Sequence, residues 1–269
     1  HRDVRRTKRF FRKTQEADGV LATREEDDDS VVAGEVWLFR RRRSVDAPDG
    51  TDDVADASVM DAVDVPVAVD APDVVLADAA TCPRDKTCGD GLTPRAIGEL
   101  TALGLEDWLR ARTVNRGLRA HGFGQTLMLP WPGGSLPNWG SAAPRMDLDA
   151  RIRQVALDDG ATGVEGAKAV DARVEGGRVR GVTFQRGSES FEIECERLVV
   201  ADGVRSGLGK VLGREWHKDT VYAVAGRCYV DSTMADDPWI SSHLELRGET
   251  GEVLSGYGWI FPLGGGQVN

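Results

Sequence analysis

The spacing of apolar residues predicts a β-meander followed by a buried strand. Apolar and polar residues alternate over Ala167–Val174 and Val179–Phe184, as in strands with one buried face, and Gly176-Gly177 supplies the turn between them. Phe191–Cys195 predicts a third strand. The nearly continuous apolar run Arg197-Leu-Val-Val-Ala201 predicts a buried strand. We therefore expect a mostly antiparallel sheet in this part of the chain.

Helical spacing and short apolar runs predict the remaining elements. Apolar residues share one face from Thr93-Pro94 to Gly104, with Thr93 as the N-cap and Gly104 as the stop. A short helix is expected around Trp108-Leu109, and a longer one over Leu148–Asp158, capped by Asp147. Further strands are predicted over Asp73–Asp78, Tyr222–Tyr229 and His243–Leu246.

The chain changes character near residue 74. Residues 1–43 are rich in Arg and Lys, residues 44–80 hold ten Asp and neither Lys nor Arg, and 29 of the 32 Gly follow Cys88. Few apolar residues recur at a regular period over residues 1–63, which favours disorder there. We expect residues 1–73 to be disordered or translated out of frame, with a divergent extension as the alternative.

Bulk composition excludes few function classes. The chain has 269 residues, a formal net charge of -10 and a pI near 5.0. That charge is opposite to the balance of a generic nucleic-acid binder. The four Cys show no C-x-x-C spacing, so we expect reduced thiols, no metal site and a cytoplasmic protein without a spanning helix.

Three segments carry candidate chemistry. Cys82-Pro-Arg-Asp-Lys-Thr-Cys-Gly-Asp-Gly91 follows the strand ending at Asp78, and an acid at the end of the second strand of a dinucleotide-binding fold bonds a ribose hydroxyl. Its Gly89-Asp90-Gly91 turn lets backbone N–H groups approach a phosphate or a flavin ring. Leu198–Ser206 joins a strand to Asp202-Gly203, and Tyr257-Gly-Trp-Ile-Phe-Pro262 is an aromatic strand. Ordinary glycine turns and core aromatics are the alternatives.

These segments resemble known flavoproteins. Pro83–Arg95 resembles the segment after the second strand in the geranylgeranyl reductase family, and Tyr257–Pro262 resembles that family's Y-x-W-x-F-P signature at the substrate pocket. Leu198–Ser206 is similar to the second FAD motif of the flavoprotein hydroxylase superfamily. Asn115–Gly124 and Leu129–Gly134 resemble family segments near the flavin and the pocket. The resemblance covers about residues 74–269.

The resemblance implies a set of site residues. It implies FAD contacts for Asp78, Arg84, Lys86, Cys88, Gly89, Asp90, Gly91, Arg119, Asp202 and Gly203. It implies substrate contacts for Trp131, Tyr257, Trp259, Phe261 and Pro262, and the candidate proton donors are Cys88 and Tyr257.

The implied fold is α/β. An FAD-binding Rossmann-like layer of the glutathione-reductase type, as in hydroxylase-like flavoproteins, is interleaved with a mostly antiparallel substrate sheet. We expect residues 74–210 to form part of the FAD-binding domain and residues 211–269 the start of a substrate-binding domain. The family's first G-x-G-x-x-G turn is not found ahead of Gly89, and its third FAD motif lies further on than residue 269. We therefore expect an incomplete domain.

The implied reaction is FAD-dependent reduction of a double bond in a geranylgeranyl group or a menaquinone side chain. The electron donor, a reduced nicotinamide or another reductant, stays open. The prenyl substrate implies peripheral contact with a membrane, and no nucleic-acid partner is expected. One alternative is an aromatic monooxygenase, because that class shares the Asp-Gly motif. The other is a non-catalytic remnant that cannot hold FAD, because the glycine-rich turn is missing.

Overall fold

The computed structural model describes residues 35–40, 73–87, 89–215 and 223–269. The disorder and frame predictions for 1–73 therefore lie outside the described residues, except at 35–40 and 73, and Cys88 lies outside them as well. Among the described residues, no helix is both long enough and apolar enough to cross a bilayer.

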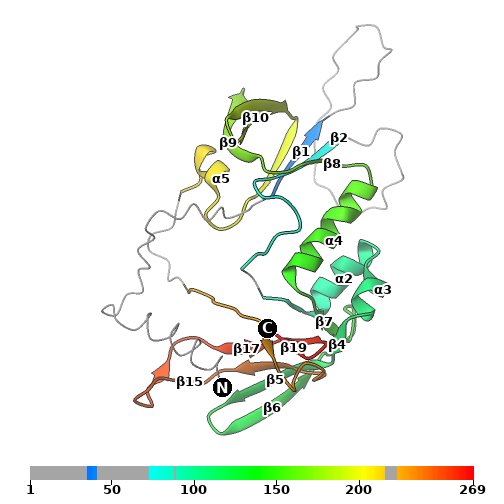
Figure 1. The fold of residues 1–269 in the computed structure, drawn as a ribbon, viewed down its shortest axis with the longest axis vertical. Helices are drawn as coiled ribbons and strands as arrows, with labels where there is room; N and C mark the ends of the chain where they lie inside the picture. Colours follow the sequence, from blue (N-terminus) through cyan, green and yellow to red (C-terminus); the bar gives the residue numbers. More distant parts are fainter. Residues whose placement is uncertain (1–34, 41–72, 88, 216–222) are drawn as a thin grey trace. The chain divides into compact units, whose positions relative to one another are not determined.

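One four-stranded sheet carries the predicted strand that ends at Asp78. Its order is β12 (Arg197–Ala201), β1 (Glu35–Arg40), β2 (Asp73–Asp78) and β8 (Thr162–Val164), and Figure 1 draws β1, β2 and β8 side by side. Strand β1 is antiparallel to both of its neighbours, whereas β2 and β8 are parallel. Strands β12, β2 and β8 therefore share one direction, and β1 runs against them.

Strand β1 corrects an expectation. Residues 1–63 were predicted to hold no paired strand, but Glu35–Arg40 pairs along its length with β2 and with β12. Leu38 is fully buried with Val75 and Ala77 of β2. The apolar run Val36-Trp-Leu-Phe39 is too short to show a period, so its strand character becomes clear only from its partners.

The predicted meander is confirmed. Strands β9 (Lys168–Glu175), β10 (Arg178–Arg186) and β11 (Glu189–Glu194) form an antiparallel sheet in the order β11-β10-β9. Gly176 and Gly177 make its first turn with φ of 56° and 77°, a region that favours glycine. Buried residues of the meander pack with those of β1, β2 and α5 (Gly207–Val211) in one core: Leu38, Val75, Ala77, Ala167, Val182, Phe184, Cys195 and Leu208.

A second core surrounds the helices. The helices are α2 (Pro94–Ala102), α3 (Glu106–Arg110) and α4 (Arg145–Asp158). Their buried residues gather with those of neighbouring segments: Leu92, Ile97, Leu100, Leu105, Leu109, Trp139, Ala143 and Leu148. Helix α2 begins after Thr93 as predicted. Helix α4 begins three residues earlier than predicted, with Pro144 as N-cap, because the Asp147 carboxylate pairs with Arg112 at 3.1 Å and does not cap.

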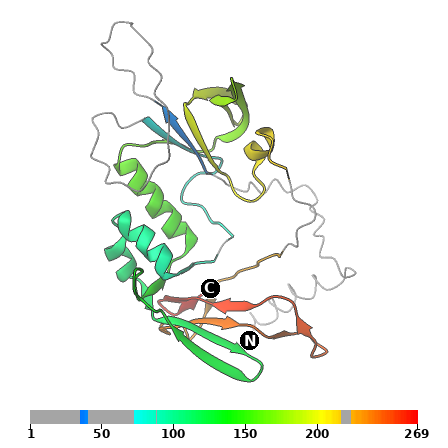
Figure 2. The ribbon, with the colours of Figure 1, turned by 180° about the vertical axis from the view of Figure 1, so that it is seen from behind.

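The remaining strands form smaller sheets. One has the order β17 (Gly258–Ile260), β14 (Ile240–His243), β5 (Gly117–Gly122) and β6 (Gln125–Pro130). Figure 2 shows its green β5–β6 hairpin beside the orange and red strands. Another has the order β3 (Gly91–Leu92), β7 (Gly140–Ala142) and β4 (Thr113–Asn115), and a third β13 (Val230–Asp231), β19 (Gln267–Val268) and β18 (Pro262–Gly264). Strands β15 (Leu246–Arg247) and β16 (Val253–Leu254) form a pair.

Two strand predictions after residue 215 are wrong. Residues 223–229 form no strand, and Val224 is 92% exposed, so its apolar side chain has no sheet to cover. Strand β14 ends at His243, where a strand was expected to begin, because the buried residues are Ile240 and Ser241. The β14–β5 pairing also joins residues on both sides of 210 in one sheet. The domain division at that position stays a prediction.

Candidate functional site

The Gly89-Asp90-Gly91 turn seats an aromatic ring. A Cβ added to Gly91 would lie 2.3 Å from Cε1 of Phe261, and one added to Gly89 would lie 3.2 Å from Cε2 of the same ring. Gly91 has no room for a side chain and Gly89 has little, so the Phe261 ring lies close against the glycine backbone. We expected these glycines to admit a phosphate or a flavin. In this structure their close contact is with Phe261.

Asp90 lies at the centre of this turn and is fully buried. Its Oδ2 accepts a hydrogen bond of 2.7 Å from Asn269 Nδ2, and its main-chain oxygen accepts one of 3.0 Å from the Ala143 amide. Its Oδ1 is buried without a hydrogen-bond partner among the described residues. The turn is thus anchored at both the backbone and the side chain, with one acceptor oxygen left over.

Asn269 connects Asp90 to the aromatic strand. Its amide donates to the Phe261 oxygen at 3.0 Å, its carbonyl accepts from the Phe261 amide at 2.9 Å, and its Oδ1 accepts from Trp259 Nε1 at 3.3 Å. The sequence analysis missed Asn269, because 179 positions separate it from Asp90 and no local pattern marks the contact.

The three aromatic residues of the signature lie in a row. Ring centroids are 5.8 Å apart between Tyr257 and Trp259 and again between Trp259 and Phe261. Alternate residues of a strand share a face, so these rings form one apolar wall. Tyr257 is 58% exposed at one end of the row, and Pro262 is buried at the other. Trp131 belongs to a different contact set, because its Nε1 donates to Asn115 Oδ1 at 2.8 Å.

Tyr229 and Arg227 adjoin the turn from another segment. Burial, and then the Asp90 carboxylate, raise the pKa of the Tyr229 phenol to about 12. The Arg227 guanidinium lies 4.8 Å from the centroid of the Tyr229 ring, donates to the Lys86 carbonyl at 2.8 Å and pairs with Asp85. The sequence analysis missed both residues. Lys86 itself enters these contacts through its backbone.

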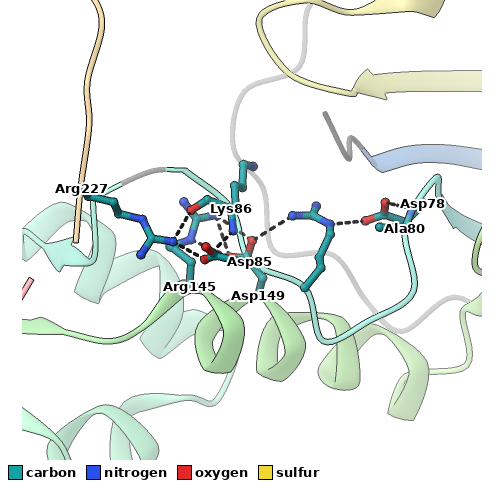
Figure 3. A network of polar contacts seen from close by, with 8 residues as sticks. Asp78, Ala80, Asp85, Lys86, Arg145, Asp149 and Arg227 are labelled. Atoms are coloured by element: carbon teal, nitrogen blue, oxygen red, sulfur yellow. Dashed lines mark hydrogen bonds and ion pairs between the residues drawn. The ribbon is translucent and has the colours of Figure 1, made fainter. Parts of the chain in front are cut away.

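Asp78 is held in a buried chain of charges (Figure 3). Its Oδ1 accepts from the Ala80 amide at 2.9 Å and its Oδ2 accepts from Arg84 Nε at 2.8 Å. Arg84 also lies 3.8 Å from the Asp149 carboxylate, which accepts two hydrogen bonds from Arg145 at 2.8 and 2.9 Å. Both oxygens of Asp78 therefore accept a hydrogen bond from within the chain.

The other predicted cofactor residues differ in how far contacts within the chain occupy their polar groups. Arg119 forms two hydrogen bonds to Asp237, at 2.5 and 3.1 Å, so its guanidinium is taken up by a carboxylate of the chain. Asp202 Oδ2 accepts from the Leu208 amide at 3.3 Å, but its Oδ1 is buried without a hydrogen-bond partner among the described residues. Gly203 turns the chain with a φ of 86°, which favours glycine.

Asp78 and Asp202 emerge at the same edge of the sheet. Glu35, the first residue of β1, pairs with Asp78 on one side and with Ala201 on the other. Dinucleotides bind at the carboxyl ends of parallel strands, so this is the edge where FAD would lie. Strand β1 runs away from it and ends at Arg40, opposite Asp73.

The fit of these residues to FAD is partial. The unpartnered oxygen of Asp202 is at the correct edge and fits a hydroxyl or N–H donor of the cofactor. Asp78 and Arg119 have their polar groups occupied, and Phe261 fills the glycine cradle. Asp202 is thus the residue best placed to hold FAD in this arrangement.

Comparisons with known proteins agree with the fold and the motifs. No family model matches the chain. A menaquinone reductase of Mycolicibacterium smegmatis is 56% identical over 198 residues, which are 73% of this chain and 48% of that protein. The chain thus spans about half the length of this curated relative.

Solved structures support the same fold class. The FAD-dependent chondrochloren halogenase CndH of a myxobacterium matches with a TM-score of 0.57 and 16% identity over 73% of this chain and 46% of that one. A geranylgeranyl bacteriochlorophyll reductase-like protein of Thermoplasma acidophilum matches with a TM-score of 0.52 and 21% identity over 68% of this chain and 45% of that one. The predicted α/β flavoprotein fold is confirmed. The chain belongs to the geranylgeranyl reductase-like family of FAD-dependent oxidoreductases.

Proposed function

We propose that this chain is part of an FAD-dependent enzyme that reduces a double bond of an isoprenoid chain. The single observation that carries the proposal is its 56% identity over 198 residues to a protein named menaquinone reductase. The prenyl side chain of a menaquinone is accordingly the substrate we propose, and a geranylgeranyl group is the related choice.

The aromatic wall suits such a substrate. A prenyl chain offers apolar surface and π-bonds, so it binds best to a dry, concave and mostly apolar site. The rings of Tyr257, Trp259 and Phe261 provide a continuous apolar row. A phenolic substrate of a monooxygenase would need a polar partner, because an unpaired buried hydroxyl is costly. The row itself offers only the Tyr257 hydroxyl and the Trp259 indole N–H as polar groups, so it favours the prenyl chain.

Bound FAD would supply the hydride, and the protein would position the reactants and exclude water. Asp202 would bind the cofactor through its free oxygen, and the aromatic row would orient the alkene. We propose Cys88 and Tyr257 as candidate proton donors, and the 58% exposed Tyr257 can exchange protons with solvent. Peripheral membrane contact is also a proposal. It is supported by the exposed apolar residues Phe123, Leu127 and Leu129 of the β5–β6 hairpin.

A second candidate is that the 269-residue chain holds FAD weakly or not at all. The direction of β1 and the internal bonds of Asp78 favour it, because both withdraw groups from the cofactor edge. A glycine-rich βα turn contributes several backbone N–H groups to the pyrophosphate, and this edge receives the start of β1 instead.

One experiment separates the two candidates. The purified chain is mixed with FAD, freed of excess cofactor, and its flavin absorbance is compared with the protein concentration. The same sample is chemically reduced and incubated with menaquinone, and products heavier by two hydrogens are sought by mass spectrometry. Stoichiometric flavin with hydrogenated product supports the reductase. Oxygen-dependent hydroxylation of an aromatic acid would move the protein to the monooxygenases, and lack of bound flavin would favour the second candidate.

A further inference from the structure

Asp90 lies where three separate contacts tie the aromatic row to the glycine turn. The Phe261 ring covers the glycines on both sides of it, its carboxylate binds Asn269, and Asn269 binds the Trp259 indole. The aromatic row is thus fixed by a carboxylate, an amide and an indole connected in series.

The arrangement is costly if it serves stability alone. Asp90 is fully buried, with 0% of its surface exposed to solvent, and its carboxylate interacts with both Asn269 and the Tyr229 phenol. A buried carboxylate loses its hydration, and only such contacts offset the loss. Asparagine would keep the bond to Asn269 without burying a charge. The contact with Asn269 therefore needs an acceptor at position 90 and does not itself need the charge.

The chain of contacts from Asp90 through Asn269 sets the orientation of the Trp259 indole. Asn269 is held by its backbone to Phe261 in both directions, so its side chain can turn only about its own bonds. When Asp90 accepts from Nδ2, the amide oxygen of Asn269 must face the opposite way, toward Trp259 Nε1. Without the carboxylate the amide is free to flip, and the indole loses its fixed acceptor.

We infer that Asp90 is a positioning residue of the substrate wall, acting through Asn269 on Trp259. The inference rests on the proposed function, because that function makes the aromatic row the surface that meets the prenyl chain. Neither Asp90 nor Asn269 needs to touch the substrate. Their effect is to present the Trp259 ring in one orientation.

The first test measures the environment of the Trp259 ring in the absence of substrate. The chain is labelled with 5-fluorotryptophan, and the Trp259 resonance in the ¹⁹F spectrum is assigned with Trp259→Phe. Asp90→Ala and Asn269→Ala should each move or broaden this resonance, and the double variant should move it no further than either single one. Asp90→Asn should restore it, because the asparagine side chain still accepts from Asn269.

A matched control comes from the second indole–asparagine pair of the chain. Trp131 Nε1 donates to Asn115 Oδ1. Asn115→Ala should move the Trp131 resonance, assigned with Trp131→Phe, and leave that of Trp259 in place. A Trp259 resonance unmoved in both folded Asp90→Ala and Asn269→Ala would overturn the inference.

The pKa of Tyr229 reports the charge of Asp90 separately from the hydrogen bond between Asp90 and Asn269. The pKa of Tyr229 is raised to about 12, partly by the Asp90 carboxylate. In Asp90→Asn, the pKa of Tyr229 should fall toward the ordinary phenol value. The pKa is followed by tyrosinate absorbance, with Tyr229→Phe as the blank, and the Trp259 resonance should not move. A Trp259 signal that moves as far in Asp90→Asn as in Asp90→Ala would contradict the inference.

Kinetics in the flavin-loaded enzyme complete the test. Asn269→Ala should raise KM for the prenyl substrate about tenfold with a smaller change in kcat, because it disturbs binding surface and not chemistry. A fall in kcat at unchanged KM would contradict a positioning role. If hydride transfer to prenyl substrates is not observed at all, the proposed function fails, while the fluorine spectra still decide whether Asp90 orients Trp259.

Discussion

Arg84 donates a hydrogen bond of 2.8 Å from Nε to Asp78 Oδ2, and both side chains are buried. The contact joins the end of β2 to the loop that carries the glycine turn. It also uses the carboxylate that was expected to meet the cofactor. The first prediction concerns the stability that this pair contributes.

Arg84→Ala should lower the free energy of unfolding by about 3–5 kcal/mol, because removal of one partner leaves the buried Asp78 charge uncompensated. Urea unfolding followed by circular dichroism measures the change. Glu106→Ala is the matched control, since it removes only an exposed ion pair with Arg110. It should cost less than about 1 kcal/mol. Similar losses in both variants would show that the Asp78 pair is not insulated from solvent.

Asp202→Ala should weaken FAD binding by about 1.5–3 kcal/mol, the range for a hydrogen bond to a charged group. The expectation follows from the unpartnered Oδ1 of Asp202 at the cofactor edge. Titration of FAD fluorescence gives the affinity. Asp158→Ala, on the exposed side of α4, should bind FAD as the parent does. Unchanged affinity in Asp202→Ala would place the cofactor elsewhere.

Gly91→Ala should displace the Phe261 ring, because the new Cβ would lie 2.3 Å from Cε1. Overpacking of this kind costs about 1–3 kcal/mol. The Tm by calorimetry should therefore drop, and adding Phe261→Leu should restore part of the loss by making space. Gly207→Ala is the control, since nothing lies within 4 Å of its added Cβ. Equal Tm values for the two alanine variants would refute the packing.

The fold should lose stability as the pH falls below about 6.5, the unfolded pKa of histidine. Burial, and then His121, lower the pKa of His243, whose ring stacks on His121 with centroids 4.9 Å apart. Between the folded and unfolded pKa values the unfolded chain binds more protons, so stability rises with pH through that window.

The measurement is the Tm between pH 5 and 7.5 for the parent and two variants. His243→Gln should flatten the dependence on pH. His121→Gln should reduce it without removing it, because burial is the larger cause of the lowered His243 pKa. A His243→Gln profile that parallels the parent would assign the dependence to other groups.

Leu38→Ala should destabilise the chain by about 2–5 kcal/mol, because this side chain is fully buried in the core that contains Val75 and Phe184. Chemical denaturation provides the value. Val199→Ala, at a 49% exposed position of β12, should change stability by less than about 0.5 kcal/mol. A Leu38→Ala variant as stable as the parent would mean that β1 is dispensable to the sheet.

Local patterns were sufficient for the elements whose signals are contained in a few residues. The meander, Asp73–Asp78 and the helix after Thr93 were predicted because alternation, helical period and turn glycines lie within each segment. Helix α4 was placed too late because Asp147 was expected to cap its start, whereas the Asp147 carboxylate pairs with Arg112, 35 positions away, a contact that the apolar period does not contain.

The segments that carry the candidate site residues were predictable, but the side-chain pairings of those residues were not. Asp78, Arg119 and the glycine turn stand where their segments were expected, yet their partners come from distant parts of the chain. Arg119 meets Asp237 across 118 positions, and Asp90 meets Asn269 across 179. One sequence carries no signal for such pairs, because they depend on how the sheets bring remote segments together.

The reversed strand β1 has a consequence for how the sheet accepts sequence change. Backbone pairing on both sides holds it, and a buried leucine anchors it between β2 and β12. Its binding therefore resembles the addition of a peptide strand to a sheet. Main-chain hydrogen bonds hold such a strand in place, and the alternation of its side chains decides which of them, here Leu38, faces the core.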